Sequence, residues 1–456
     1  MDQTKKRTLI ISEIVQHNSD KKDLENELKE VLQSINSEEI ILVGEQLKEL
    51  ASKLKNALFF RGSKEVSSYL NQNKKTNHFY ILKGARQYLF EGIVDILEQK
   101  QHLTKIEVNL STLISNLSHY RKLLKPETKI MVMVKAFAYG TSIVEVAKLL
   151  EIQKVDYLAV AYTDEGIILR ETGIKTPIMV MNPALDDLHS LKQFNLEPEV
   201  YSLEQLYHFN TIPSLKLHIK LDTGMHRLGF DKNTFPDLIT FLKENNRTNI
   251  VSCLTHLAGA DEHTHDDYTN RQLSSFKKMT DEISIVSKKS FLKHALNSAG
   301  IERHTSHQMD MVRLGIGLYG FGNDKNIQPC LTLKTTISQI RELEKGETVG
   351  YGRKGEINKS TSVATLPIGY ADGYDRRFSQ GVGSVIINNQ EAFVIGNVCM
   401  DMTMVDVTNI NCSPGDEVII YDKTHNITKL ATRINTISYE LLTHLSERVR
   451  RIFFFD

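Results

Sequence analysis

Lys135 stands where an amine could do covalent chemistry. It directly follows the apolar run MVMV (131–134) and precedes AFAYG (136–140). Apolar neighbours disfavour the charged form of a lysine, and a neutral amine can attack a carbonyl group to form a Schiff base. A lysine at a strand end can instead extend along apolar surface and keep its charge in water. On these residues alone, the two interpretations are equally good.

The segment GIGLYG (315–320) has the spacing G-x-G-x-x-G. A dinucleotide site requires a helix directly after this pattern, whereas the residues that follow here are rich in strand-forming types. The glycines could still expose backbone N–H groups to a phosphate, and barrels of alternating strands and helices often bind phosphate near their last strands. Tight closure of a barrel is the structural alternative.

Polar residues also stand at the ends of other apolar runs. KLDTGMHRLGF (220–230) contains Arg227, which can donate to an anionic oxygen, and THLAGAD (255–261) contains His256. ALNSAG (295–300) contains Asn297 and Ser298. Any one of these residues is more often structural than catalytic, so the informative feature is the position that they share at strand ends.

Tyr351 lies between two glycines in VGYGRKG (349–355). Flanking glycines leave a phenol exposed and let the backbone approach a ligand, although a tyrosine in this setting is usually a turn residue. Two further polar segments, IGYADGYDRR (368–377) and GNVCMDMTMVDV (396–407), interrupt sequence that otherwise has strand character.

Eight apolar runs would position Lys135 and the other polar residues at strand ends. A helical pattern follows each run except the last, which closes the series. The runs begin near residues 131, 157, 177, 198, 216, 251, 292 and 312. Eight β/α units over about residues 103–335 favour a TIM (β/α)8 barrel over an open sheet. Active-site groups of such a barrel converge at the carboxyl ends of its strands.

The sections on either side differ from this barrel. Residues 1–102 alternate four short apolar runs, at 9–11, 40–43, 57–60 and 79–82, with helical patterns, which predicts a small Rossmann-like α/β domain. A helix is expected at 86–99, followed by a charged connector near 100–105. Residues 336–456 are rich in glycine and in short alternating runs, which predicts a β-rich domain with one late helix near 428–440.

Composition narrows the function classes. The chain of 456 residues has 56 Lys+Arg and 56 Asp+Glu, so its charge gives no reason to expect nucleic acid or an anionic membrane as a partner. It contains no run of about 18 apolar residues that would span a membrane. Four cysteines without metal or disulfide spacing fit a reducing compartment, so we expect a cytoplasmic protein.

Nine segments, in order along the chain, resemble those of the alanine racemase family, whose members use pyridoxal 5'-phosphate (PLP). They are VKAFAYG, VDYLAVAYTDEGIILRETGI, KLDTGMHRLGF, THLAGADE, NSAG, VRLGIGLYG, VGYGRKG, LPIGYADGY and NVCMDMTMVDV. The resemblance covers about residues 104–456 and is far more specific than any single motif. It implies a PLP-binding TIM barrel (103–335) and a C-terminal β-domain (336–456), acting on alanine as a head-to-tail homodimer with shared active sites.

The resemblance implies roles for four residues at the reaction centre. Lys135 matches the Schiff-base lysine, which is also one of the two catalytic bases. Tyr351 matches the opposite base, which the partner subunit supplies. Arg313 matches the arginine facing the pyridine nitrogen, and Arg227 matches the arginine near the PLP phenolic oxygen and the substrate carboxylate.

The resemblance also implies roles for residues around this centre. His256 matches a residue that orients an arginine beneath the ring, and Met400 and Asp401 match a pair near the substrate carboxylate on the partner side. Lys220 matches a lysine that is carbamylated in some members. The remaining cofactor positions are Tyr139, Asn297, Ser298, Gly315, Ile316 and Tyr370, and no metal site is expected.

Two residues depart from the family pattern. Phe137 stands where many members have asparagine, and it would share a face with Lys135 if the strand continued that far. Glu447 stands where some members carry a tyrosine. Both substitutions are expected to change the wall of the site.

Residues 1–102 resemble a second family more weakly. IILVGEQL (40–47) and FYILKGARQYLFE (79–91) look like the C-terminal domain of the Mur ligase that adds D-alanyl-D-alanine to the peptidoglycan precursor. The sequence has no G-x-x-x-x-G-K-[ST] motif for ATP, and Ala85 replaces a serine of the ligase pattern. We therefore expect no ligase activity, and three interpretations of the segment stay open: a remnant of the ligase, a dimer-stabilising element or a docking domain.

The expected reaction is racemisation of alanine, which supplies D-alanine for peptidoglycan. A broad-specificity amino-acid racemase, a PLP-dependent decarboxylase of the same fold type and a non-enzymatic PLP-binding protein remain as alternatives. Decarboxylases place an acid at the pyridine nitrogen, where this chain has Arg313. PLP carriers lack the β-domain that contains Tyr351.

Overall fold

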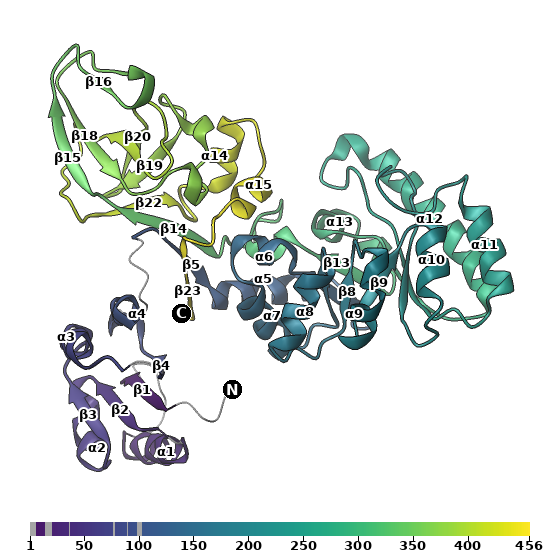
Figure 1. The fold of residues 1–456 in the computed structure, drawn as a ribbon, viewed down its shortest axis with the longest axis horizontal. Helices are drawn as coiled ribbons and strands as arrows, with labels where there is room; N and C mark the ends of the chain where they lie inside the picture. Colours follow the sequence, from purple (N-terminus) through teal and green to yellow (C-terminus); the bar gives the residue numbers. More distant parts are fainter. Residues whose placement is uncertain (1–5, 14–20, 36, 76–77, 89, 98–102) are drawn as a thin grey trace. The chain divides into compact units, whose positions relative to one another are not determined.

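The computed structural model describes residues 6–13, 21–35, 37–75, 78–88, 90–97 and 103–456. The chain divides into two compact units, residues 1–102 and 103–455 (Figure 1). Part of the connector predicted near 100–105, and the end of the helix predicted at 86–99, lie outside the described residues.

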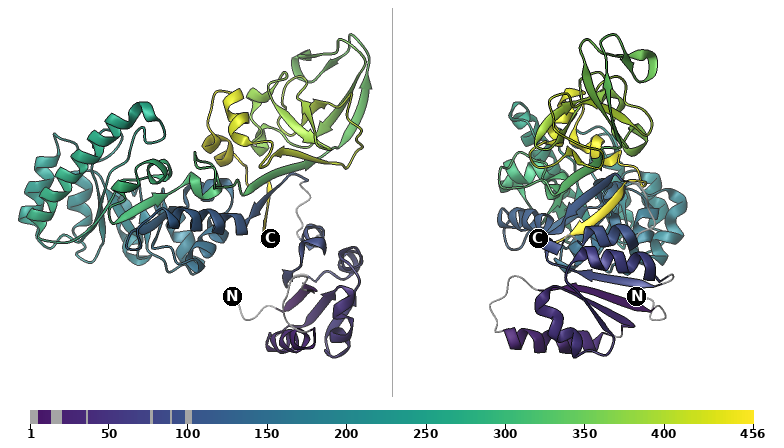
Figure 2. Two further views of the ribbon diagram at one scale, coloured as in Figure 1. Left: turned by 180° about the vertical axis from the view of Figure 1, so that it is seen from behind. Right: turned by 90° about the vertical axis from the view of Figure 1, so that its left-hand side faces the viewer.

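The first unit is a parallel four-stranded sheet between two layers of helices (Figures 1 and 2). The strand order is β3-β2-β1-β4, and every neighbouring pair is parallel. Alternate side chains of a strand point to opposite faces, so Leu9 and Ile40 join one core and Ile10 and Ile41 join the other. The elements are β1 (Arg7–Ser12), α1 (Lys21–Ser34), β2 (Glu39–Val43), α2 (Lys48–Ser52), β3 (Ala57–Phe60), α3 (Ser63–Asn73), β4 (Phe79–Lys83) and α4 (Glu91–Leu97).

The second unit contains the predicted eight-stranded parallel barrel, in the order β12-β11-β10-β9-β8-β7-β6-β13. Two backbone hydrogen bonds close the ring between its end strands, from Asp310 N to Lys293 O (3.2 Å) and from Arg313 N to Leu296 O (2.9 Å). The strands are β6 (Lys129–Met133), β7 (Tyr157–Val160), β8 (Ile178–Val180), β9 (Glu197–Val200), β10 (Leu217–Lys220), β11 (Ile250–Leu254), β12 (Leu292–His294) and β13 (Met311–Leu314).

Helices on the outside of the barrel explain why its strands read as nearly continuous apolar runs (Figure 1). Because both faces of the sheet are covered, β6 to β9 are buried almost throughout. The helices are α5 (Leu110–Lys122), α6 (Lys135–Gly140), α7 (Ile143–Ile152), α8 (Thr163–Glu171), α9 (Leu188–Gln193), α10 (Leu203–Phe209), α11 (Phe235–Glu244), α12 (Asp266–Ser287) and α13 (Ser298–Arg303).

The C-terminal part is rich in strands, as predicted. Its largest sheet has the order β20-β19-β22-β14-β5-β23, so β5 and β14, which flank the barrel in sequence, pair with the strands of this part. The strands are β5 (Lys105–Asn109), β14 (Leu331–Thr336), β15 (Gln339–Leu343), β16 (Thr348–Val349), β17 (Gly355–Glu356), β18 (Thr361–Leu366), β19 (Ser384–Ile387), β20 (Gln390–Phe393), β21 (Thr403–Asp406), β22 (Glu417–Tyr421) and β23 (Arg450–Phe454).

The prediction of a single helix at 428–440 is wrong in one respect. Two short helices occupy this region, α14 (Ile427–Arg433) and α15 (Ser438–Thr443). Asn435 between them has a φ of 57°. Asparagine tolerates this left-handed conformation, which ends a right-handed helix, so the apolar pattern continues while the helix does not.

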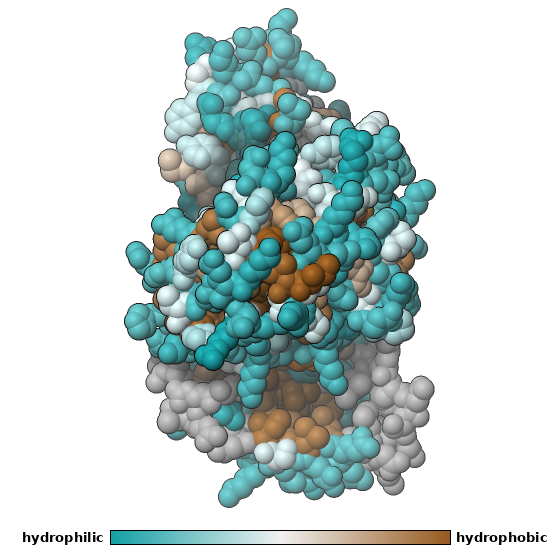
Figure 3. All heavy atoms as spheres, turned by 90° about the vertical axis from the view of Figure 1, so that its right-hand side faces the viewer, coloured by the Kyte–Doolittle hydropathy of each residue, from teal (hydrophilic) through white to brown (hydrophobic). Residues whose placement is uncertain are grey.

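The surface seen in Figure 3 is mainly hydrophilic, with apolar patches between the polar side chains. Phe79 and Ile81 are partly exposed on β4, at the edge of the first sheet. Within the described residues, no helix has both the length and the apolar character needed to cross a membrane.

Candidate active site

Lys135 lies just beyond the carboxyl end of β6, at the first residue of an unusual turn. Ala136, Phe137, Ala138 and Tyr139 all have φ between 52° and 56° and ψ between 40° and 55°, so four consecutive residues are left-handed. A left-handed helical conformation costs an L-residue about 1–2 kcal/mol, so contacts elsewhere in the fold must offset this cost. The turn separates Lys135 from the helix α7 that follows.

Phe137 would share a face with Lys135 only if the strand continued to it, and this condition is not met. The strand ends at Met133, and a left-handed turn replaces the alternation of faces. The Phe137 ring is 54% exposed in the single chain. About half of the bulky side chain therefore faces solvent within one chain.

The Lys135 amine lies among charged groups from several barrel strands. Burial lowers its pKa, as the sequence predicted, and the nearby Arg227 guanidinium lowers it further. The carboxylates of Glu199 and Glu165 act in the opposite direction, and Arg313 acts with Arg227. The amine is therefore neutral, and able to act as a nucleophile, at a lower pH than a lysine in water.

Tyr139, Ser298 and Gly315 lie together above the last two barrel strands. The Ser298 hydroxyl accepts hydrogen bonds from Gly315 N (3.0 Å) and Gly317 N (3.3 Å). A Cβ added at Gly315 would lie 2.8 Å from the Tyr139 hydroxyl, so only glycine allows this close approach. Ile316 directly follows and is buried. The Ser298 and Tyr139 hydroxyls keep their own hydrogens, so together with Gly315 they form a small cradle where a phosphate would find donors.

Asn297 has a structural role in this cradle. Its side-chain oxygen accepts a hydrogen bond from Gly300 N (2.9 Å) and caps the start of α13. It thereby orients the segment that carries Ser298.

Arg313 is buried on β13, and protein acceptors take the hydrogens of both of its terminal nitrogens. Nη1 donates to Nδ1 and O of His294 (2.9 and 3.0 Å). Nη2 donates to Thr255 O (2.6 Å) and Ala295 O (3.0 Å), and lies 3.5 Å from His256 Nδ1. No hydrogen bond within the described residues uses Nε, which leaves that N–H for a ligand. Burial lowers the pKa of Arg313 to about 10, so the guanidinium remains charged at neutral pH.

A buried chain of hydrogen bonds supports Arg313 from behind. Arg313 can only donate, so the His294 Nδ1 that faces it accepts and the His294 Nε2–H donates to Ser252 Oγ (2.9 Å). Ser252 then donates to His218 Nδ1 (2.6 Å), and His218 Nε2–H donates to the Glu197 carboxylate (3.0 Å). Burial and the charge of Arg313 lower the pKa of His294 well below its usual value, which keeps this imidazole neutral.

Burial, followed by the charge of Arg313, also lowers the pKa of His256 far below its usual value. A neutral His256 beside Arg313 agrees with the orienting role that the resemblance implies for it.

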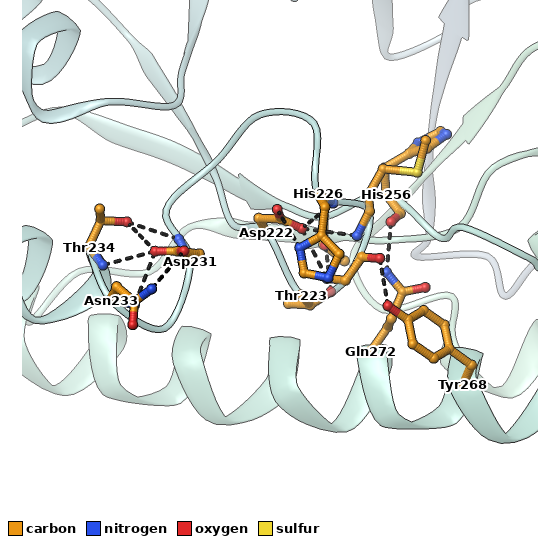
Figure 4. A network of polar contacts seen from close by, with 12 residues as sticks. Asp222, Thr223, His226, Asp231, Asn233, Thr234, His256, Tyr268 and Gln272 are labelled. Carbon is orange, nitrogen blue, oxygen red and sulfur yellow. Dashed lines mark hydrogen bonds and ion pairs between the residues drawn. The ribbon is translucent and has the colours of Figure 1, made fainter.

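The loop after β10 carries Arg227 and is held by its own polar network (Figure 4). One Asp222 oxygen accepts from the backbone N–H groups of Gly224, Met225 and His226 at 2.9 to 3.0 Å. The Tyr268 hydroxyl on α12 donates to Gly224 O (2.7 Å). The Arg227 side chain, at the end of this ordered loop, is exposed.

Lys220 is buried at the end of β10 and pairs with a carboxylate of the neighbouring strand. Its Nζ lies 3.3 Å from Glu199 Oε1. The second oxygen of Glu199 is buried and has no hydrogen-bond partner within the described residues. Burial lowers the pKa of Lys220, and the Glu199 charge opposes this shift.

The remaining predicted site residues lie on the surface of the C-terminal part. The Tyr351 side chain is 74% exposed, and its backbone oxygen accepts from the Asn397 amide (3.0 Å). Tyr370 and Met400 are also exposed, and their loops are joined because the Ala371 N–H donates to Met400 O (3.0 Å).

Asp401 forms an ion pair with Arg448 (2.6 Å). Glu447, one of the two departures from the family pattern, is exposed in the turn that precedes β23.

A single chain thus brings together only part of the predicted site. Lys135, Arg227, Arg313, His256 and the Ser298 cradle are grouped at the carboxyl ends of the barrel strands. Among the described residues, no hydrogen bond or ion pair connects Tyr351, Tyr370, Met400 or Asp401 with this group.

The grouped residues fit PLP. The amine of Lys135 suits the aldehyde of PLP, the unused Nε–H of Arg313 suits an unprotonated ring nitrogen, and the cradle at Gly315 suits the phosphate. The fit rests on Gly315 in particular, because a side chain there would fill the cradle.

Sequence reasoning missed three charged residues around the lysine. Glu165 accepts a hydrogen bond from Ala136 N (2.7 Å), Glu199 pairs with Lys220, and Arg451 donates to Gly140 O (3.0 Å). Glu165 stands in the first turn of a predicted helix, which would have suggested a capping role. Glu199 was visible only as a charge in a buried strand, and nothing in the sequence indicated the contact of Arg451.

Comparison with known proteins gives consistent matches. Residues 108–322 match the N-terminal domain of alanine racemase, and residues 330–453 match its C-terminal domain. The alanine racemase of Halothermothrix orenii is 36% identical over 365 residues, which is 76% of this chain and 96% of that protein. The alanine racemase of Methanococcus maripaludis is 34% identical, over 76% of this chain and 97% of that protein.

Solved structures agree with these matches. The alanine racemase of Clostridium difficile 630 is 35% identical, with a TM-score of 0.72 over 78% of this chain and 96% of that one. The alanine racemase of Bartonella henselae, crystallised with covalently bound pyridoxal phosphate, is 26% identical, with a TM-score of 0.72 over 77% of this chain and 99% of that one.

Proposed function

The chain belongs to the alanine racemase family, and we propose that it interconverts L- and D-alanine with Lys135 and Tyr351 as the two bases. The family consists of PLP-dependent isomerases. The observation that carries this assignment is the half-buried Lys135, whose pKa is lowered, grouped with Arg313 and the Ser298 cradle at one end of the barrel. The D-alanine formed would supply peptidoglycan synthesis.

We propose that the grouped residues hold PLP. Lys135 would hold its aldehyde carbon, the Nε–H of Arg313 would serve the ring nitrogen, and the phosphate would be held by Tyr139, Ser298, Gly315 and Ile316. His256 keeps Arg313 in place, Asn297 orients Ser298, and Tyr370 lies at the site entrance. Bound PLP supplies the electron sink that makes the α-proton of alanine removable.

The residues of the chain then control the proton. The Lys135 amine takes or returns the α-proton on one face of the substrate, and the Tyr351 phenol does so on the other. Arg227 binds the substrate carboxylate, and Met400 and Asp401 from the second copy lie near it. Arg313 retains its own proton at neutral pH, so it would act toward the ring nitrogen of bound PLP as a hydrogen-bond donor and would not protonate it.

We propose a head-to-tail homodimer because one chain lacks a complete site. Tyr351 is 74% exposed and unconnected to Lys135 within its own chain. A second copy that brings Tyr351, Met400 and Asp401 over the barrel of the first would complete both sites by symmetry.

An optical assay tests the proposed function. Purified protein with PLP should convert L-alanine to D-alanine, and the reverse, without release of carbon dioxide. Release of carbon dioxide would indicate a decarboxylase. Inversion of many amino acids at similar rates would indicate a broad-specificity racemase, and binding of PLP without turnover would indicate a carrier. Each of the three results would contradict the proposal.

The Arg227→Met substitution should move the pH dependence of PLP capture. The charge of Arg227 lowers the pKa of Lys135, so its removal raises that pKa. The neutral amine then requires a higher pH, and the midpoint of covalent PLP capture by the cofactor-depleted protein shifts upward. The remaining groups that face Lys135, Glu165, Glu199, Arg313 and His256, are unchanged in the variant.

Borohydride trapping of the cofactor over a pH series measures this midpoint. Arg247→Met, which removes an exposed arginine after α11, is the control and should leave the midpoint where it is. A midpoint in Arg227→Met that stays where it is, or falls, would show that the guanidinium does not lower the pKa of Lys135.

For the first unit we propose a remnant of a Mur-ligase C-terminal domain without ligase activity. The four-stranded parallel sheet with helices on both faces supports an α/β domain of this kind, and Ala85 stands at its altered motif.

We also propose the division into domains at 1–102, 103–335 and 336–456, in which β5 leaves the barrel section to pair with the β-rich part.

We propose a cytoplasmic location. All four cysteines are free thiols in the structure, and Cys253 and Cys330 are buried, which suits a reducing compartment.

A further inference from the structure

Glu165 connects the segment that carries Lys135 to the neighbouring barrel strand. One of its carboxylate oxygens accepts from Ala136 N (2.7 Å), the residue directly after Lys135. The other oxygen accepts from Ala161 N (2.7 Å) and Tyr162 N (3.3 Å), just after β7. One carboxylate thus joins the loops that follow β6 and β7.

These contacts exceed what a helix cap requires. Glu165 is the third residue of α8, where a glutamate commonly reaches back to the N–H of the residue before the helix. That N–H belongs to Tyr162 and makes the longest of the three bonds. The two short bonds run to residues outside the helix, and one of them reaches across to the lysine turn.

The left-handed turn is fastened at both ends. Ala136 N is held by Glu165, while Gly140 O accepts from Nη2 of Arg451 on β23 (3.0 Å) and Thr141 O accepts from Nε of the same arginine (3.2 Å). The four residues between these points have the unfavourable φ values given above. Without fixed ends, they would relax toward conformations that L-residues prefer, and the Lys135 amine would move with them.

We propose that Glu165 is a positioning residue for Lys135: it fastens the start of the left-handed turn and so fixes the position of the amine at the carboxyl end of the barrel. The proposal rests on the role proposed for Lys135 above. Glu165 does not touch the reacting atoms, and its effect is exerted through the Ala136 N–H and through its charge.

The charge of Glu165 provides a second, separate effect. Five groups face the Lys135 amine from the elements around it: Glu165 from α8, Glu199 from β9, Arg227 from the loop after β10, His256 after β11, and Arg313 from β13. Among these, Glu165 and Glu199 favour the ammonium form. Replacing the Glu165 carboxylate by an amide therefore moves Lys135 further toward the neutral amine.

Two variants of the full-length protein separate the hydrogen bond from the charge. Glu165→Ala removes both, and amide hydrogen exchange at Ala136 should become about tenfold faster or more, because the acceptor is lost; tenfold corresponds to about 1.4 kcal/mol. Glu165→Gln keeps the size of the side chain and removes the charge. Glu171→Gln, at the exposed end of the same helix, is the matched control and should change nothing.

The charge effect is measured on the amine itself. Acylation of Lys135 in the cofactor-depleted chain, followed by mass spectrometry of its peptide over a pH series, should show a lower midpoint in Glu165→Gln than in the wild type or in Glu171→Gln. Neither this measurement nor the exchange experiment needs alanine or turnover, so they remain informative even if the proposed reaction is wrong.

Unchanged Ala136 exchange in Glu165→Ala, or an unmoved acylation midpoint in Glu165→Gln, would overturn the proposal. If Glu165→Ala does not fold, as judged by its circular dichroism, the exchange rate and the acylation midpoint of Glu165→Gln decide the question. The amide has a single acceptor oxygen, so in this variant either Ala136 or Ala161 should exchange faster.

Discussion

Replacing Lys135 by alanine is expected to abolish both covalent cofactor binding and racemisation. The variant lacks the amine that combines with PLP and one of the two bases. Loss of a general base alone costs about 10²–10⁴-fold in rate, and loss of covalent attachment adds to this, so kcat/KM should fall by at least about 10⁴-fold. The visible absorbance of the protein-bound cofactor and the alanine optical-inversion rate measure the two effects.

Lys148→Ala is the matched control, because Lys148 is exposed on α7. It should retain the visible absorbance and the full rate. A borohydride-reducible link between PLP and the Lys135→Ala protein would show that another residue is the attachment point, and the assignment would be wrong.

Replacing Tyr351 by phenylalanine should leave the cofactor bound and reduce racemisation by about 10²–10⁴-fold, the usual effect of removing a general acid–base group. The substitution removes only the hydroxyl of an exposed ring, so folding should be unaffected. The family resemblance implies that Lys135 takes the proton of D-alanine and Tyr351 that of L-alanine. Lys135 remains in this variant, so D-alanine should still exchange its α-proton with solvent deuterium without inversion. Proton NMR of D-alanine in heavy water and polarimetry distinguish exchange from inversion.

Tyr207→Phe, another exposed tyrosine, is the control and should racemise alanine at the normal rate. Normal inversion by Tyr351→Phe in both directions would remove Tyr351 from the mechanism. So would an equal loss of exchange and inversion from D-alanine, because that result would place the defect before proton transfer.

Mixing the two inactive variants tests whether the bases come from different chains. In a mixed dimer of Lys135→Ala and Tyr351→Phe, one site has both bases and the other has neither. Random exchange of subunits would make half of the dimers mixed, so about a quarter of the wild-type activity should return. If both bases belonged to one chain, mixing would restore none.

The barrel was predictable because each strand is a continuous apolar run between helical patterns. That signal is local, since it records which residues both faces of a covered sheet must bury. The same reasoning failed at Asn435, where one residue in a left-handed conformation divides a helix without changing the apolar pattern. It left open whether the strand continues to Phe137, because no local preference indicates that KAFAY would leave the strand in a left-handed turn.

The candidate site likewise contains residues that the sequence identified and residues that it did not. Residue types at strand ends, together with the family resemblance, identified Lys135, Arg227, His256 and Arg313, and the structure groups all four. The acidic partners were not identified, because Glu165 reaches the Lys135 turn across two loops and Glu199 reaches Lys220 from an adjacent strand.

Local sequence therefore determines the order of strands and helices, the residues that line the barrel and the chemical groups at its carboxyl end. Only the folded chain decides how those groups are held: the strained turn after Lys135, its attachment to Glu165 and Arg451, and the exposure of Tyr351 on a separate surface. The physical reason is that periodicity records burial residue by residue, whereas a strained conformation is stable only when contacts from distant parts of the chain offset its cost.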